Sequence, residues 1–83
     1  MISKTAIVKD SDIGKNTRIY KFVNIYGAQI GNNCKIGTYV EIQKEVIIKN
    51  NVTISSHSFI CSKVTIYDDV FIAHGVMTIN DIH

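Results

Sequence analysis

The sequence predicts an all-β solenoid, in which short parallel strands wind around one core and little or no α-helix forms. Two observations predict this fold: isoleucine recurs at every sixth position over most of the chain, and polar or glycine-containing triplets separate the isoleucines. Repeats at a fixed period are typical of proteins built from stacked structural units. With 83 residues, the chain has the length of one small domain.

The spacing of the isoleucines is the strongest signal. Eight of them follow one another at intervals of six residues: Ile30, Ile36, Ile42, Ile48, Ile54, Ile60, Ile66 and Ile72. The same interval extends upstream, after one five-residue step, through Ile25, Ile19, Ile13 and Ile7. The residue two positions before each of the eight is small or β-branched, such as Val46 before Ile48. Because alternate residues of a strand face the same side, both members of each pair are expected to point inward.

The triplets between the strands predict tight corners. Four of them are Gly14-Lys15-Asn16, Gly31-Asn32-Asn33, Lys49-Asn50-Asn51 and Tyr67-Asp68-Asp69. Asn, Asp and Gly are the residues that tolerate left-handed backbone. A helix is rejected for residues 5–77, because a six-residue interval drifts by about 240° per step around a helix and the β-branched content favours strands. We therefore expect one domain over residues 1–83, with regular repeats over about 5–77 and looser winding over 78–83.

Composition excludes several classes of protein. The net charge of +2 is too small to predict binding to nucleic acid or to a membrane surface, and the apolar residues form no run long enough to span a bilayer. Cys34 and Cys61 have neither metal-ligand nor disulfide-framework spacing, and no apolar stretch typical of a signal peptide follows Met1. We therefore expect a cytoplasmic protein without nucleic-acid or membrane partners.

The repeat itself resembles a known one. An aliphatic residue, a Gly/Asn-rich corner and a small residue two positions before the next aliphatic are similar to the hexapeptide repeat of left-handed β-helix acyltransferases. The resemblance covers about residues 5–77. It implies a single-stranded left-handed parallel β-helix in which three hexapeptides make one triangular coil, or about 4.6 coils for this chain.

The last part of the chain resembles one group within that superfamily. It reads Asp-Asp-Val-Phe at 68–71, His-Gly-Val-Met at 74–77 and Asn-Asp at 80–81, which is similar to the nucleotide-linked amino-sugar N-acetyltransferases; residues 17–25 resemble their first coils. The resemblance implies acetyl-CoA as donor, a UDP- or dTDP-linked amino sugar as acceptor, and a role in surface polysaccharide or glycan synthesis. It also implies a homotrimer formed through the prism faces, with active sites between adjacent prisms, and no metal.

The same motif implies the site residues. Asn80 matches the position that holds the sugar near its reacting amine, and His74 and Asp81 match neighbouring positions, so Asn80 and His74 are the catalytic candidates. Asp81, His83 and Met77 are the substrate-binding candidates, while the residues that bind acetyl-CoA are not defined. A neutral amine attacks a thioester, the oxyanion needs a donor, and a proton must leave the nitrogen. His74 is equally consistent with a base and with a structural corner residue, because the departing CoA thiolate is an alternative proton acceptor.

Two other functions remain open. One is a non-catalytic β-solenoid that serves only for assembly. The other is a zinc protein like the γ-class carbonic anhydrases, since the chain has three histidines, but the intervals between His57, His74 and His83 do not match that class. His57 is expected to be a solvated corner residue.

Three further features have two interpretations each. The chain ends where the resembling family continues into Pro-Arg and into coils that contribute most acetyl-CoA contacts. It is therefore expected to be the N-terminal portion of such an enzyme or a short assembly module. The 83 residues alone are expected to show weak or no acetyl transfer. Tyr20 and Phe22 either pack on the outside of a corner or form a rim that contacts a ligand or a neighbouring subunit. Lys44, Lys49 and Lys63 are expected to be solvated, unless one of them lies near a groove between prisms and attracts CoA phosphates there.

Overall fold

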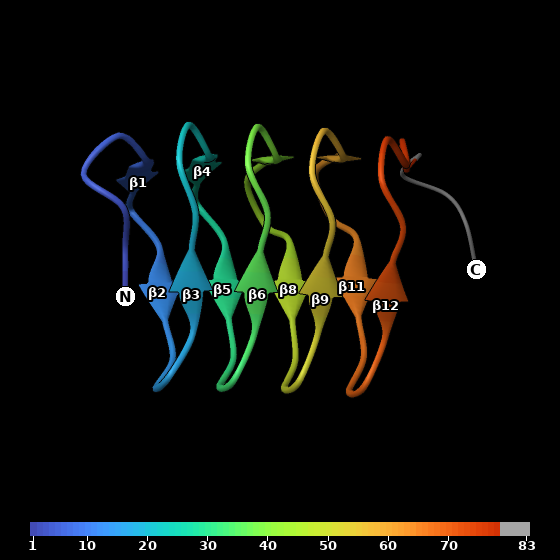
Figure 1. Ribbon diagram of the computed structural model, residues 1–83. Helices are drawn as coiled ribbons and strands as arrows, with labels where there is room; N and C mark the ends of the chain where they lie inside the picture. The colour runs from blue at the N-terminus through green and yellow to red at the C-terminus, as the bar shows by residue number, and fades with distance from the viewer. Residues whose placement is uncertain (79–83) are drawn as a thin grey trace.

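The computed structural model describes residues 1–78, and within them it contains twelve short strands and no helix (Figure 1). The strands are β1 (Ile7–Lys9), β2 (Asp12–Ile13), β3 (Arg18–Ile19), β4 (Asn24–Tyr26), β5 (Gln29–Ile30), β6 (Lys35–Ile36), β7 (Glu41–Ile42), β8 (Ile47–Ile48), β9 (Thr53–Ile54), β10 (Phe59–Ile60), β11 (Thr65–Ile66) and β12 (Phe71–Ile72). The described part of the chain has no helix of the length and apolarity required to cross a bilayer.

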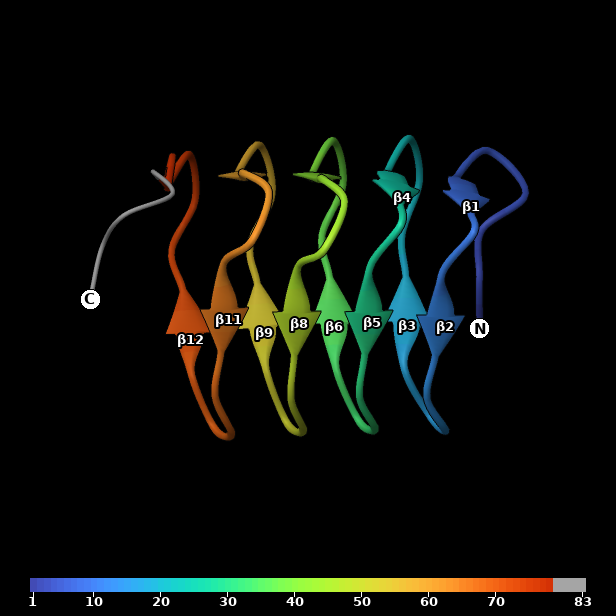
Figure 2. The ribbon, with the colours of Figure 1, turned by 180° about the vertical axis from the view of Figure 1, so that it is seen from behind.

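The strands form three parallel sheets, because each strand pairs with the strand three places further along the chain. The sheet orders are β1-β4-β7-β10, β2-β5-β8-β11 and β3-β6-β9-β12. Figures 1 and 2 show the resulting stack of coils from opposite sides. Bridges between Ile2 and Ile19 and between Phe59 and Met77 extend the stack at its two ends. The predicted fold, a left-handed parallel β-helix of hexapeptide repeats, is confirmed.

The core of the coil consists of the regularly spaced isoleucines and the small residues that precede them. Ile25 stacks on Ile42, and Ile42 on Ile60, through parallel pairing of their strands. All three side chains are fully buried, as are Val40 and Val46 to within 1%. Each buried isoleucine contributes roughly 1.5–3 kcal/mol relative to an exposed one. The outward residue of each strand is partly or fully exposed, which is the alternation expected for a sheet with one solvated face.

The first coil corrects one part of the isoleucine pattern. Ile7 was predicted to point inward, but its side chain is 62% exposed, and the neighbouring Val8 pairs with Ile25. Both residues are apolar, so the sequence alternation does not distinguish them; the pairing with β4 does. The step from Val8 to Ile13 is therefore five residues long and stacks under the five-residue step from Ile25 to Ile30. Paired residues are 17 apart here, as for Ile13 and Ile30, and 18 apart in the next coil, as for Ile30 and Ile48.

The predicted corners are present between the β2 and β3 sheets, where the left-handed residues are Asn16, Asn33, Asn51 and Asp69. We call this column the asparagine corner. Successive amide groups bridge its coils: the Oδ1 atom of Asn32 accepts from the N–H of Lys15, and the Oδ1 atom of Asn50 accepts from the N–H of Asn32, both at 2.8 Å. Gly31 is needed for a different reason, since a Cβ atom there would lie 2.6 Å from the carbonyl oxygen of Lys49.

Candidate active site

His74 lies in the corner that follows β12, at the C-terminal end of the described solenoid. Its Nδ1 atom is 2.9 Å from the hydroxyl oxygen of Ser56, which occupies the equivalent corner of the preceding coil. The backbone N–H of Gly75 donates to the carbonyl oxygen of Ser56 at 3.0 Å, so the two corners are in register. Gly75 adopts a φ of +67°, which turns the chain sharply after the histidine. The imidazole is exposed to solvent, and its Nδ1 atom is fixed by the hydrogen bond with Ser56.

This contact determines what the imidazole can do chemically. If Nδ1–H donates to Ser56, the neutral ring carries its lone pair on Nε2, which forms no hydrogen bond with any of residues 1–78. If the serine hydroxyl donates instead, Nε2 carries the hydrogen. The first arrangement suits a proton acceptor and the second a hydrogen-bond donor. Either way, Ser56 restricts the ring of His74 to a defined orientation.

The other predicted site residues divide into two groups. Met77 begins the next coil through its bridge to Phe59, and its side chain is 75% exposed. His74 and Gly75 form the corner, and only Val76 separates this corner from the bridge at Met77. His74 and Met77 therefore both lie in the last described coil. The remaining candidates lie outside the described residues: Asn80, Asp81 and His83.

Sequence reasoning missed the partner of His74 and the neighbours of His57. Ser56 is 18 residues from His74, and this interval is one full coil, which is the signal that identifies it. His57 is exposed with a φ of +63°, so the prediction that it is a corner residue is confirmed. Its ring also packs against the ring of Tyr39, with centroids 5.1 Å apart. Tyr39 in turn stacks on Phe22, one of the two residues whose position in the pattern was ambiguous.

Residues 1–78 contain no candidate metal site. No three His, Cys, Asp or Glu side chains of this part of the chain converge on a point where an ion would be held. His74 occupies the same position of its coil as Ser56, and not the position of His57. The ring of His57 packs against Tyr39. Both cysteines, Cys34 and Cys61, are buried free thiols.

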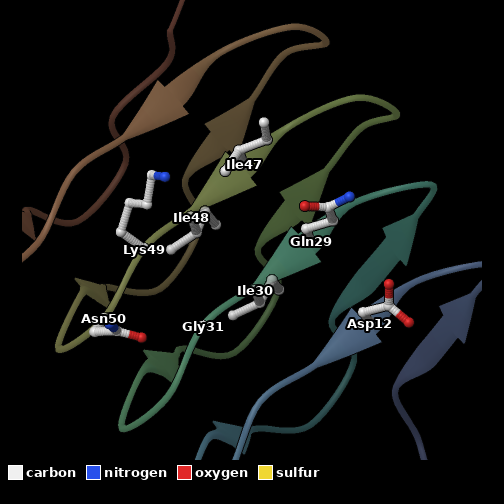
Figure 3. Close-up of a pocket in the computed structure, with 8 residues that line it drawn as sticks. All are labelled: Asp12, Gln29, Ile30, Gly31, Ile47, Ile48, Lys49 and Asn50. Atoms are coloured by element: carbon white, nitrogen blue, oxygen red, sulfur yellow. The ribbon is translucent and has the colours of Figure 1, made fainter.

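A shallow depression of about 290 Å³ lies elsewhere, on the outer face of the β2-β5-β8-β11 sheet. Figure 3 shows that Asp12, Gln29 and Ile47 project from three successive strands along it, with Lys49 beside them. Gly31 forms part of its lining because it has no side chain. Of the predicted site residues within 1–78, neither His74 nor Met77 lines this depression. It offers one carboxylate and one ammonium group but no imidazole, so the corner at His74 is the better candidate for proton transfer.

Comparison with known proteins gives matches of two kinds. The sequence model described as "Bacterial transferase hexapeptide (six repeats)" matches residues 10–44 and 27–62, which together make up more than half of the chain. The chain is also similar to proteins named "Bifunctional protein GlmU". It is 36% identical to that of Picosynechococcus sp. over 76 residues, 32% to that of Rippkaea orientalis over 77, and 30% to that of Thermosynechococcus vestitus over 79.

These alignments cover nearly all of this chain but little of the relatives. They include 90% of the chain for the first two relatives and 94% for the third. The same alignments include 16%, 16% and 17% of the relatives' own lengths. The chain therefore spans about one sixth of each relative that it matches.

Proposed function

Because this chain belongs to the bacterial transferase hexapeptide family, we propose that it is part of an acetyl-CoA-dependent N-acetyltransferase that acts on a UDP- or dTDP-linked amino sugar. The family supports an acyltransferase. The narrower choice of an amino sugar rests on the motif at residues 74–81. The observation that carries the proposal is the position of His74, whose Nδ1 atom is fixed by Ser56 at 2.9 Å while the ring remains accessible to solvent.

The reaction would use few protein groups. The amine of the sugar attacks the carbonyl carbon of the acetyl thioester, the C–S bond breaks, and the CoA thiolate leaves. A proton must also leave the nitrogen, and His74 would accept it on Nε2 with Ser56 holding Nδ1–H. Asn80 would orient the amine of the sugar, while Asp81, His83 and Met77 would contact the sugar or its nucleotide. Backbone N–H groups of a rigid coil would supply donors for the oxyanion.

The assembly and location follow from the same proposal. We expect a homotrimer whose prisms pack through their faces, with His74 near a boundary between two prisms. Lys49, on the outer face of its sheet, would be available to CoA phosphates in a groove of this kind. The free thiols of Cys34 and Cys61 fit a reducing cytoplasm.

The test is an activity assay on the product of the complete open reading frame that contains codons 1–83. Release of the CoA thiol is followed after addition of acetyl-CoA and a panel of UDP- and dTDP-linked amino sugars. Asn80→Ala is expected to lower kcat/KM by about 100-fold or more, since a residue that positions the reacting group contributes strongly to the rate. A near-normal rate for this variant would remove Asn80 from the site. Absence of thiol release with every acceptor would favour the non-catalytic assembly module instead.

A further inference from the structure

The three corners of the coil carry different kinds of residue at the position with positive φ. The asparagine corner has Asn or Asp at every level, as backbone preference dictates. The corner between the β3 and β1 sheets has instead Phe22, Tyr39, His57 and Gly75. We call this column the aromatic corner. Large rings are disfavoured in left-handed backbone, so their presence at three successive levels calls for a compensating interaction.

Part of that compensation is stacking between the rings. The ring centroids of Phe22 and Tyr39 are 5.2 Å apart with an interplanar angle of 17°, and those of Tyr39 and His57 are 5.1 Å apart at 32°. These spacings lie in the range of favourable aromatic pairs. The rings nevertheless stand in solvent, since Phe22 is 49% exposed and Tyr39 is 54% exposed. The aromatic corner is thus an exposed column of flat rings whose centroids are evenly spaced.

The column stops at His57 because the next level is a glycine. Gly75 has the same left-handed conformation as the three aromatic residues, with a φ of +67°. A Cβ atom built on it would have no atom of residues 1–78 within 4 Å, apart from those of the glycine and its two chain neighbours. Among residues 1–78, Tyr39 is the one aromatic neighbour of the His57 ring, and Gly75, at the next level, has no side chain. The space beside Gly75 continues the column and is open where a side chain would begin.

Hydrogen-bonding groups flank this open level. Ser56 directly precedes His57 in the chain, and the imidazole of His74 directly precedes Gly75. The two side chains contact each other across the coils at 2.9 Å. A flat ring on His57 would thus have a ring face beneath it and polar groups at its edge. That combination suits a nitrogen heterocycle better than a purely apolar ring.

We propose that the level above His57, beside Gly75, binds the nucleobase of a nucleotide substrate by stacking on the imidazole ring. This inference rests on the proposed function, in which both substrates carry a base: a pyrimidine in the nucleotide-linked sugar and adenine in acetyl-CoA. Stacking is available to either base, since each has a π-face. A ribose and a diphosphate separate the base from the amine of the sugar, and a longer arm separates adenine from the thioester. The corner would therefore anchor the base end of the substrate and set the direction in which the reacting end extends.

The test is equilibrium binding to the product of the complete reading frame, measured by calorimetry. Uridine and thymidine monophosphates probe the acceptor base, and adenosine 3′,5′-bisphosphate probes the CoA base. His57→Asn removes the ring but keeps a residue that tolerates left-handed backbone, and it should weaken binding of one of the two probe types by about tenfold. Gly75→Asn, which fills the open level, should weaken the same probe. His57→Tyr retains a ring and should bind that probe within about twofold of the unaltered protein.

Three results would overturn the inference. One is equal binding of all probes to His57→Asn and to the unaltered protein. Another is weaker binding in His57→Tyr as well, which would show that stacking is not the cause. The third is dissociation of the oligomer in His57→Asn, seen by light scattering, which would assign the aromatic corner to contact between copies. Failure of the proposed function gives a different result from failure of this inference. Base binding that depends on His57, without any acetyl transfer, would contradict the proposed function and leave the inference standing. Acetyl transfer with binding that does not depend on His57 would contradict the inference and leave the proposed function standing.

Discussion

The Nδ1 atom of His74 lies 2.9 Å from the hydroxyl oxygen of Ser56, although 18 positions of sequence separate the two residues. One complete coil spans this interval, so the register of the coils, and not the local sequence, gives His74 its partner. The rigid stacking of parallel strands therefore orients a side chain that would otherwise rotate freely on the surface. An oriented imidazole is the feature that a proton acceptor requires.

Ser56→Ala is expected to lower kcat by about three- to tenfold, the effect of losing one hydrogen bond that orients a catalytic group. KM for both substrates should change less than kcat, because the serine acts through His74 and lies only at the edge of the proposed base site. The neighbouring Ser55→Ala is the matched control, since Ser55 has no side-chain hydrogen bond within residues 1–78, and it should leave kcat unchanged. Equal effects of the two substitutions in steady-state kinetics would show that Ser56 does not act through His74.

His74→Ala should lower kcat by about 100-fold or more if the imidazole accepts the proton of the amine. The protein should fold normally, because the side chain is exposed. Circular dichroism and oligomeric mass check the fold, and thiol release measures the rate. A change of less than about threefold would be too small for general-base catalysis. It would identify His74 as a structural corner residue and leave the CoA thiolate as the proton acceptor.

Ile42→Ala is expected to lower the free energy of unfolding by about 2–5 kcal/mol, because Ile42 is fully buried. Ile7→Ala should cost about 0.5 kcal/mol, since Ile7 points outward and is 62% exposed. Urea denaturation of the two variants, monitored in parallel, measures both values. A loss at Ile7 as large as that at Ile42 would contradict the register in which Val8, and not Ile7, pairs with Ile25.

The two glycines at positions 31 and 75 should respond differently to alanine. In Gly31→Ala the new Cβ atom would lie 2.6 Å from the carbonyl oxygen of Lys49, so the backbone must move at a cost of about 2–3 kcal/mol. In Gly75→Ala the new atom meets no side chain or backbone of residues 1–78 beyond its chain neighbours, and the left-handed conformation costs about 1 kcal/mol. Thermal or urea unfolding of both variants compares the two effects. A larger loss at Gly75 would show that the corner at His74 is more tightly packed than the structure indicates.

Much of the fold follows from the sequence because each repeat encodes the same local choice. The isoleucines and the residues two positions before them predicted the core, and Asn16, Asn33 and Asn51 predicted one corner. The first coil was predicted in the wrong register, since Ile7 and Val8 are both apolar and only pairing with β4 decides between them. The hand of the coil came from resemblance to a known family, because general rules for parallel connections favour the opposite hand.

The site was less predictable because it depends on contacts between coils. The motif pointed to His74, but Ser56 becomes visible as its partner only when the coil length of 18 residues is applied. The stack of Phe22, Tyr39 and His57 was missed for a related reason. The interval is 17 residues in the first coil and 18 in the next, so the five-residue step must be placed before the three residues fall into one column.

The most direct test of the central proposal is detection of the acetylated sugar itself. The product of the complete reading frame is incubated with acetyl-CoA labelled with ¹³C in the acetyl group and with UDP- and dTDP-linked amino sugars, and the mixture is analysed by mass spectrometry and NMR. The account predicts a labelled N-acetyl group on one of these sugars, formed in proportion to the CoA released. Thiol release without a labelled amide, or label found only on a hydroxyl group or on the protein, would contradict it.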